Sequence, residues 1–308
     1  SYNAGLVAKY WIEDIAKIPC NIEIASEYRY RRPILLDHTL FLTLSQSGET
    51  ADTIEALKAA KKINQSIVSL CISNSPESSL TRLSDLTFFT HAGPEIGVAS
   101  TKAFTTQLTA LALLVTSIGK LQNKINKNQE NEIVHGLKRL PGLINEALNQ
   151  KNQIKELANR FLDKNSALFL GRGTMHAIAM EGALKLKEIS YIHAEAYPAG
   201  ELKHGPIALI DRDMPVIAIA PNDDLLEKLK SNLQEVKSRG SQMLVFEDEN
   251  SQIESLDAME VVPITSNLGR ITAPIIFTIP LQLLSYYVAI KKGTDVDKPR
   301  NLAKSVTV

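Results

Sequence analysis

The fold is decided by residues 39–50, which read Thr39-Leu-Phe-Leu-Thr-Leu-Ser45-Gln-Ser-Gly-Glu-Thr50, and by the stretch that follows them up to Ile63. Residues 39–44 form a short apolar run, which is typical of a buried strand. Residues 45–50 are rich in serine, and the spacing of apolar residues over 51–63 predicts a helix. A strand that leads through a short loop into a helix is the repeating unit of a parallel sheet, because parallel strands need a crossover connection.

The same order recurs along the chain. We expect further strands over 66–72, 86–90, 167–170, 214–220 and 243–246, and helices over 4–15, 94–118, 180–188 with its flanks, and 225–238. Residues 271–290 carry no charge, but Pro274, Pro280 and Gln282 disfavour a membrane span, and we interpret them as a strand followed by a buried helix. The fold class is therefore α/β, with two tandem doubly wound domains that each hold a mostly parallel sheet flanked by helices.

Composition changes between Lys120 and about Gln150, where Asn, Lys, Gln and Glu dominate. We place the boundary in this solvated, largely helical connection, with a first domain over 1–135 and a second over 150–308. The last part of the second domain, 293–308, reads as a frayed terminal tail. The second half has a strand before its first helix and the first half has none, so we expect that the sequence as given starts inside a domain.

Bulk properties exclude several classes of function. The 308 residues hold 34 basic and 34 acidic side chains, without a basic block, which argues against a nucleic-acid partner. Cys20 and Cys71 have no ligand-like His or Cys near them, so neither a metal site nor a disulfide framework is expected. We expect a cytoplasmic protein that neither crosses a membrane nor binds a metal.

One predicted helix carries charges on an apolar surface. Glu181, Lys185 and Glu188 are spaced i, i+4 and i+7, which places them within about 60° of one another around a helix. Carboxylates and amines on a buried helix are costly unless they are paired or used in chemistry. An ordinary ion pair on the surface is the alternative.

Two loops have the composition of binding sites. Residues 45–50 combine three hydroxyls with Gly48 at a helix start, which suits the phosphate of a small molecule; a helix N-cap with spare serines is the alternative. The corresponding place in the second half, 220–224, holds two aspartates that would repel a phosphate. His204 lies in a loop bounded by glycine and proline, where it could shuttle protons or be a plain surface residue.

Five stretches together resemble the isomerase part of the glucosamine-6-phosphate synthase family, which is built of two sugar-isomerase domains. They are residues 45–50, 95–102, 181–188, 200–206 and 297–304. The resemblance implies conversion of fructose 6-phosphate and ammonia into glucosamine 6-phosphate, a step in amino-sugar and cell-envelope precursor synthesis, without a cofactor. In the full family enzyme the ammonia comes from glutamine through a glutaminase domain. Residue 1 is serine here, so this polypeptide is not expected to use glutamine by itself.

The resemblance also implies roles for individual residues. Lys304 would form a Schiff base with the sugar, Glu188 would move the proton between C1 and C2, and His204 would open the ring. Lys185 would offset negative charge, with Glu181 as support. The implied substrate contacts are Ser1, Ser45, Gln46, Ser47, Thr50, Val98, Ser100 and Ala303. His204 is expected to reach the active site of the neighbouring subunit, which implies a homodimer.

Two other functions remain open on the sequence alone. A simple phosphosugar isomerase would share the fold without transferring ammonia. Residues 297–304 argue against it, because they resemble the tail of the synthase family. A non-catalytic sugar-phosphate sensor would keep the loop over 45–50 but would not need the charges at Glu181, Lys185 and Glu188.

Overall fold

The computed structural model describes residues 1–255 and 258–304. The chain divides into two compact units, one made of residues 1–124 together with residues 301–304, and the other of residues 125–300. The helix Lys127–Asn149 (α6), which the sequence suggested as a connection, belongs to the second unit. Residues 301–304 group with the first unit instead of the second, and residues 305–308 of the predicted tail lie outside the described residues.

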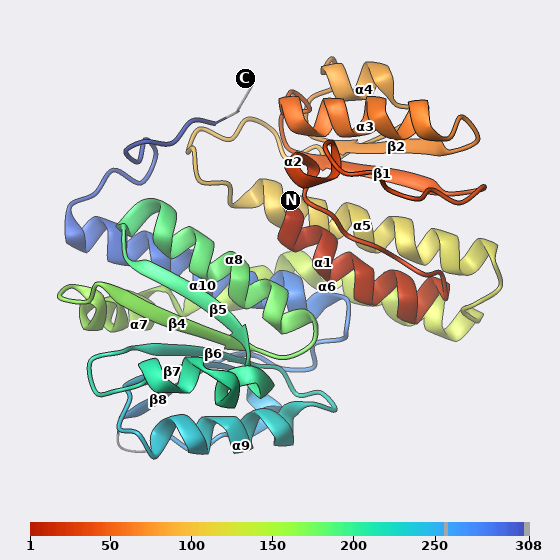
Figure 1. Ribbon diagram of the computed structural model, residues 1–308. Helices are drawn as coiled ribbons and strands as arrows, with labels where there is room; N and C mark the ends of the chain where they lie inside the picture. The colour runs from red at the N-terminus through yellow and green to blue at the C-terminus, as the bar shows by residue number, and fades with distance from the viewer. Residues whose placement is uncertain (256–257, 305–308) are drawn as a thin grey trace. The chain divides into compact units, whose positions relative to one another are not determined.

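The first unit holds a parallel sheet of three strands in the order β1-β2-β3. Leu42 pairs with Leu70 and Ile72 pairs with Phe88, so the register is continuous across the sheet. Helices α3 and α4 lie on one face and helices α1 and α5 on the other (Figure 1). The elements are α1 (Tyr2–Trp11), which continues as a π-helical turn over Ile12–Ala16, α2 (Ala25–Tyr28), β1 (Leu40–Ser45), α3 (Ala51–Ile63), β2 (Val68–Ser73), α4 (Ser79–Leu83), β3 (Leu86–Phe89) and α5 (Lys102–Leu121).

The second unit holds a parallel sheet of five strands in the order β5-β4-β6-β7-β8. The chain leaves β4 toward one edge and returns to its other side, which is the topology of a doubly wound sheet. The elements after α6 are α7 (Lys151–Leu157), β4 (Ser166–Gly171), α8 (Thr174–Ser190), β5 (His193–Pro198), β6 (Val216–Ala220), α9 (Leu226–Lys237), β7 (Met243–Asp248), β8 (Met259–Thr265) and α10 (Thr272–Lys292), with short 3₁₀ turns over Ala158–Phe161, Ala199–His204, Pro206–Leu209 and Glu249–Ser251. The predicted fold class, parallel sheets flanked by helices in two units, is confirmed.

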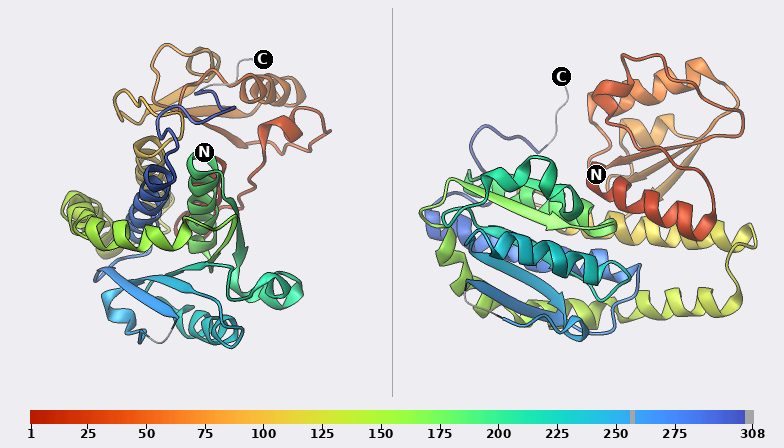
Figure 2. Two further views of the ribbon diagram at one scale, coloured as in Figure 1. Left: turned by 90° about the vertical axis from the view of Figure 1, so that its left-hand side faces the viewer. Right: turned by 60° about the horizontal axis from the view of Figure 1, so that its bottom comes forward.

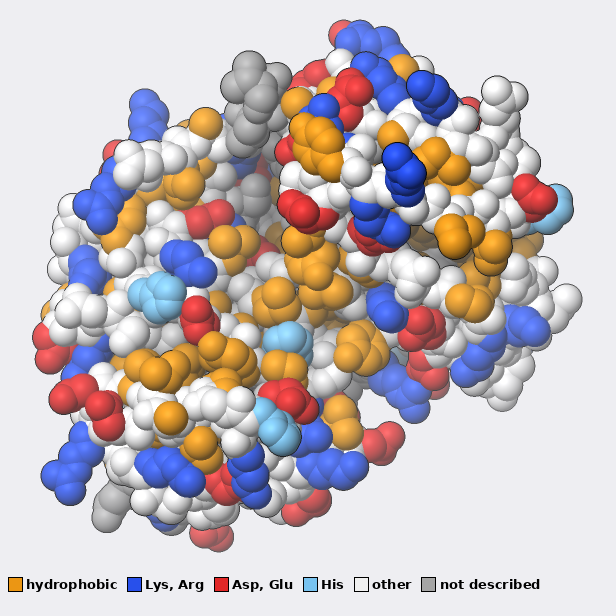
Figure 3. Space-filling model, viewed as in Figure 1, with side chains coloured by type: hydrophobic (Ala, Val, Ile, Leu, Met, Phe, Trp, Pro, Cys, Tyr) orange, Lys and Arg blue, Asp and Glu red, His pale blue; other side chains and the backbone are white. Residues whose placement is uncertain are grey.

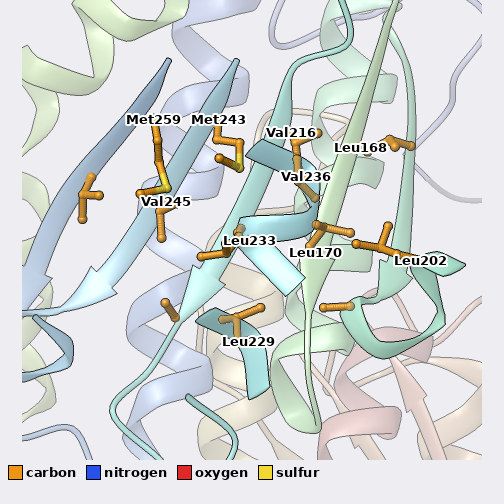
Figure 4. Packing of buried hydrophobic residues seen from close by; sticks show 14 of the residues in the cluster. Leu168, Leu170, Leu202, Val216, Leu229, Leu233, Val236, Met243, Val245 and Met259 are labelled. Atoms are coloured by element: carbon orange, nitrogen blue, oxygen red, sulfur yellow. The ribbon is translucent and has the colours of Figure 1, made fainter. Parts of the chain in front are cut away.

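Alternate residues of β4 serve two layers of the second unit. Leu168 and Leu170 pack with Leu229 and Leu233 of α9 in one apolar cluster (Figure 4). The opposite face is covered by α8 and α10, which run side by side (Figure 2). A Cβ atom at Gly182 would lie 2.8 Å from Leu281 of α10 and 3.0 Å from Phe169 of β4. The glycine therefore lets α8, the helix with the charged residues, approach both of its neighbours.

Most of the predicted elements are present within two residues of their expected ends, but two predictions are wrong. The helix expected over 94–118 begins only at Lys102, because residues 94–101 form a loop. The segment 271–290 is one helix, not a strand and a helix, since Pro274 falls in the first turn, where proline is tolerated. Strands β5 and β8 were not predicted from the sequence.

Two helices in the described part of the chain, α5 and α10, are long and apolar enough to cross a membrane by length and composition alone. Buried core helices pass the same test, and 50% and 67% of their apolar windows are buried inside the fold. On the face shown in Figure 3, basic and acidic side chains are interspersed over each unit, in line with the balanced charge of the chain.

Candidate functional site

The loop over 45–50 connects β1 to the start of α3 and is curled by internal hydrogen bonds. Ser45 is buried and its Oγ accepts from Gly48 N at 2.9 Å, while Ser47 Oγ accepts from Glu49 N at 3.2 Å. Gly48 has a φ of +69°, and a Cβ atom there would lie 2.0 Å from Ser78 Oγ, so only glycine fits. The result is a tight turn of hydroxyls at the positive end of a helix of 13 residues, a place suited to an anion.

The next loop, after β2, holds this turn in place. Asn74 N donates to Gln46 O at 3.1 Å and Leu80 N donates to Gly48 O at 3.1 Å. Glu49 Oε1 accepts from Ser79 N at 2.7 Å, and hydrogen bonds from the side chain and the backbone of Ser79 lower the pKa of Glu49. The only carboxylate of the loop is therefore bound at the start of α4. Thr50 is the N-cap residue of α3, and its side chain makes no capping hydrogen bond.

The loop over 94–101, which precedes α5, binds Lys304. Lys304 Nζ lies 3.0 Å from Glu95 Oε2 and donates to Gly97 O at 2.7 Å. The predicted substrate contacts Val98 and Ser100 follow Gly97 in this loop and are half-buried, and Ala303 is exposed. Lys304 therefore lies against residues 94–101, the segment that the sequence analysis had wrongly assigned to helix α5.

Glu95 folds back over the start of α5. Its side chain is 5% exposed, and its Oε1 accepts from Thr101 N at 2.8 Å and from Ala103 N at 3.2 Å. Burial by itself raises the pKa of Glu95, but the hydrogen bonds from Thr101, Lys304 and Ala103 outweigh it and lower the pKa. Glu95 is therefore a buried carboxylate that stays charged.

Ser1 lies at the N-cap position of α1, and its Oγ accepts from Gln107 Nε2 of α5 at 3.0 Å. The hydrogen bonds described for the loop over 45–50 lead to residues 74–80, and those of Lys304 lead to Glu95 and Gly97. Asn74 Nδ2 in turn donates to Gly93 O at 2.9 Å, so the loop that holds residues 45–50 also contacts the chain just before residues 94–101.

In the second unit, the charged residues of α8 form one cluster. Lys185 Nζ lies 2.5 Å from Glu188 Oε2 and 3.6 Å from Glu181 Oε1. The side chains of Lys185 and Glu181 are each 5% exposed, and that of Glu188 is 22% exposed. An ordinary surface ion pair, the alternative left open by the sequence, does not describe this cluster. Glu188 is the most exposed of the three side chains.

His204 ends the 3₁₀ turn Ala199–His204 and is exposed, next to Gly205, whose φ is +136°. Within residues 1–255 and 258–304, no hydrogen bond or ion pair joins His204 to the charged cluster of α8. Each unit also lacks a metal centre in its described residues, since no three His, Cys, Asp or Glu side chains converge there.

The segment 293–300 is fixed to the end of α8, so the expectation of a frayed tail is wrong for these residues. Thr294 Oγ1 donates to Ile189 O at 2.6 Å, and Arg300 N donates to the Tyr191 hydroxyl at 2.9 Å. The Arg300 guanidinium lies 4.1 Å from the centre of the Tyr191 ring, a cation–π geometry.

Sequence reasoning missed three of these partners, namely Gln107, Glu95 and Tyr191. Gln107 and Tyr191 act through contacts 106 and 109 residues away, which no local pattern reports. Glu95 offered a weak signal, because an acidic side chain shortly before a helix is a common way to satisfy the first N–H groups.

Comparison with known proteins gives a consistent result. The family model "SIS domain" matches residues 1–117 and 160–292. The curated proteins named glutamine–fructose-6-phosphate aminotransferase [isomerizing] from Escherichia coli and Pseudomonas aeruginosa are each 58% identical over 308 residues. The match covers 100% of this chain and 50% of each relative, so the chain spans about half the length of these proteins.

Solved structures agree with this result. The C-terminal domain of glucosamine-fructose-6-phosphate aminotransferase from Francisella tularensis superposes with a TM-score of 0.93 at 54% identity, covering 96% of this chain and 83% of that one. Glucosamine-6-phosphate deaminase from Thermotoga maritima gives a TM-score of 0.79 at 25% identity, covering 99% of this chain and 87% of that one. The chain belongs to the SIS domain family.

Proposed function

We propose that this chain is the isomerase half of a glutamine–fructose-6-phosphate aminotransferase and forms glucosamine 6-phosphate from fructose 6-phosphate and ammonia. The observation that carries the proposal is the buried cluster of Glu181, Lys185 and Glu188. Two carboxylates around one amine are expensive to bury for structure alone, and an aldose–ketose conversion needs such titratable groups. The identity of 58% over the whole chain to aminotransferases with this activity in their name supports it.

The proposal assigns the phosphate to the loop over 45–50. Ser45, Gln46, Ser47 and Thr50 supply hydroxyl, amide and backbone donors at the start of α3, where the helix dipole favours an anion. The positive φ of Gly48 supports this role, because it curls the backbone into a tight turn at the start of α3. Ser1, Val98, Ser100 and Ala303 are proposed as further sugar contacts.

The proposal assigns the covalent step to Lys304. The sugar ring first opens, with His204 of a neighbouring copy moving the proton between the ring oxygen and the anomeric hydroxyl. The neutral amine of Lys304 then adds to the C2 carbonyl, and the carbinolamine loses its hydroxyl as water after taking up one proton. The product is an iminium, which makes the C1 hydrogen more acidic.

Glu188 is proposed to carry the proton from C1 to C2. Its carboxylate is the most accessible of the α8 cluster, and Lys185 lies 2.5 Å from it, so the positive amine can offset the negative charge that develops on the substrate. Before this proton transfer, ammonia adds to the C2 iminium and the amine of Lys304 leaves. The proton from C1 then reaches a C2 that already carries the product nitrogen, and C1 becomes the aldehyde carbon. In the longer relatives this ammonia would come from the half of the protein that this chain does not match.

The proposal places the reaction in a homodimer in the cytoplasm. An exposed His204 without a described partner in its own chain supports a contribution to a second copy. Cys20 and Cys71 are both free thiols, which suits a reducing compartment.

The test combines product analysis with trapping. The chain is given fructose 6-phosphate and ammonium chloride, and sodium borohydride is added to reduce any iminium to a stable amine. We expect glucosamine 6-phosphate as product and one sugar phosphate bound to Lys304, located by mass spectrometry. Lys304→Ala should lose both signals while still binding fructose 6-phosphate. Lys298→Ala, an exposed lysine of the same segment, is the matched control and should keep both.

Three results would contradict the proposal. Glucose 6-phosphate without any amino sugar would favour a simple phosphosugar isomerase. Binding of fructose 6-phosphate without turnover would favour a sensor. Turnover by Lys304→Ala at the wild-type rate would remove the covalent step.

A further inference from the structure

The buried carboxylate of Glu95 has two distinct sets of partners. Its Oε1 satisfies the N–H groups of Thr101 and Ala103 at the start of α5, at 2.8 and 3.2 Å. Its Oε2 is turned the other way and lies 3.0 Å from Lys304 Nζ. One oxygen therefore anchors the side chain to the fold and leaves the other fixed in position for the lysine.

Lys304 is held by acceptors only. Besides Glu95 Oε2, its Nζ donates to Gly97 O at 2.7 Å, and the side chain is 28% exposed. A carboxylate and a carbonyl can only accept, and the hydrogen bond to the charged carboxylate is the stronger of the two, so these contacts fix the position of the amine. An ammonium group has no lone pair and cannot add to a carbonyl carbon.

We propose that Glu95 is a positioning residue that seats Lys304 against the loop over 94–101 and keeps its amine unreactive until the sugar is bound. This inference rests on the proposed function, because it takes Lys304 to be the nucleophile. In this position the amine donates to the carbonyl of Gly97, which directly precedes the proposed sugar contact Val98, so the lysine is held beside the segment proposed to bind its target.

Lys304 can leave Glu95 because the carboxylate keeps its other hydrogen-bond partners. When the lysine leaves, the carboxylate still accepts from Thr101 and Ala103 at a helix N-terminus, which stabilises its negative charge. The lysine loses one proton as it becomes the free amine, and the carbinolamine takes up one proton when its hydroxyl departs as water. The proton count therefore closes over the step without a further reactant.

Glu95→Gln distinguishes the role of Oε1, which binds the start of α5, from the role of Oε2, which binds Lys304. The glutamine oxygen can still accept from Thr101 and Ala103, while its amide nitrogen faces Lys304 as a donor without charge. Glu77→Gln, an exposed glutamate of the same unit, is the matched control. The first measurement is acetylation of Lys304 by acetic anhydride in the absence of sugar, followed by mass spectrometry. We expect acetylation about three- to tenfold faster in Glu95→Gln, because the amine is then no longer held by a charge-assisted hydrogen bond to the carboxylate, and no change in the control beyond about a factor of two.

The second measurement is turnover of fructose 6-phosphate with ammonium chloride. Loss of the contact between Glu95 and Lys304 should lower kcat about tenfold or more, because the amine is no longer held near its target. KM should stay within about threefold, because the loop over 45–50 is unchanged. Glu95→Asp restores the charge on a shorter side chain, and both its acetylation rate and its kcat should fall between those of wild type and Glu95→Gln. A purely structural role for Glu95 would not produce this ordered pattern.

Wild-type rates of acetylation or of turnover in Glu95→Gln would overturn the inference. Failure of the proposed function would look different, because wild-type protein would then give no borohydride-trapped sugar on Lys304. If Glu95→Gln does not fold, as judged by its melting curve, the comparison of wild type with Glu95→Asp carries the same prediction. Equal acetylation rates in those two proteins would then overturn the inference.

Discussion

Lys185→Met tests whether the charged cluster of α8 is held together by its central amine. Methionine is unbranched and apolar like the lysine stem, and both are good helix formers, so the substitution removes the charge without opening a large cavity. Lys185 is 4% exposed, and its amine lies between Glu181 and Glu188. The variant therefore leaves two carboxylates close together on a largely buried surface.

The size of the effect follows from burial. Removing one partner of a buried ion pair costs about 3–5 kcal/mol. The Glu188 side chain is 22% exposed and regains some water, so we expect the low end, about 3 kcal/mol. For a unit of this size, residues 125–300, each kcal/mol shifts Tm by about 2–4 °C, which gives a decrease of about 6–12 °C.

The assay is urea unfolding followed by circular dichroism, together with calorimetry. Lys187→Met on the same helix is the matched control, because Lys187 is exposed, and it should stay within about 0.5 kcal/mol of wild type. The double variant Glu181→Gln with Lys185→Met removes one carboxylate as well. It should recover at least about 1 kcal/mol relative to Lys185→Met, since residues in contact show coupling energies of this order.

Two outcomes would refute the reasoning. A cost below about 1 kcal/mol for Lys185→Met would mean that the cluster behaves as a surface pair. A double variant that is no more stable than Lys185→Met would mean that the lost free energy does not come from the stranded carboxylate. Raising the salt concentration to 1 M should change the cost little, because buried pairs are weakly screened.

Two further predictions concern the first unit. Gly48→Ala should destabilise the protein by about 2–4 kcal/mol, from its positive φ and the clash in the phosphate loop, and should weaken binding of inorganic phosphate in titration calorimetry. Gly93→Ala, with a φ of +68° but open space around it, is the control and should cost only about 1–2 kcal/mol with unchanged phosphate binding. Asp85 accepts hydrogen bonds from Lys61 and Ser69 that lower its pKa, so its contribution to stability is present at neutral pH and is lost as the pH falls through and below the ordinary aspartate range. Unfolding curves measured between about pH 7 and pH 2 should therefore fall less steeply for Asp85→Asn than for wild type, and parallel curves would contradict the assignment.

The spacing of apolar and charged residues was enough to predict elements whose structure depends on nearby residues in the sequence. The helix over 51–63 has the same ends in the structure as in the sequence analysis, because a polar serine-rich loop and a buried apolar stripe both mark it. The charge stripe of α8 was predicted from the spacing of Glu181, Lys185 and Glu188. These features needed only helix geometry and the cost of burying charge.

The errors arise where a distant residue decides the local structure. Residues 94–101 have the composition to continue α5, but the Glu95 carboxylate folds back on the helix start and fixes the segment as a loop. Strand β5 reads His193-Ala-Glu-Ala-Tyr-Pro198, with polar residues that do not suggest a strand, and it exists because it pairs along β4 at the edge of the sheet. The segment 293–300 looked mobile because its partners on α8 lie more than 100 residues earlier.

The grouping of residues 301–304 with the first unit has a practical consequence for anyone who wants to dissect this protein. A fragment that stops at residue 124 would contain the phosphate loop but not Lys304, and the Glu95 carboxylate would be left with an empty oxygen facing solvent. Spectra of such a fragment would describe an altered loop over 94–101. A fragment that reproduces the first unit would need a short peptide carrying residues 301–304, added in trans or joined through a flexible linker. Residues from both ends of this chain belong to one structural unit.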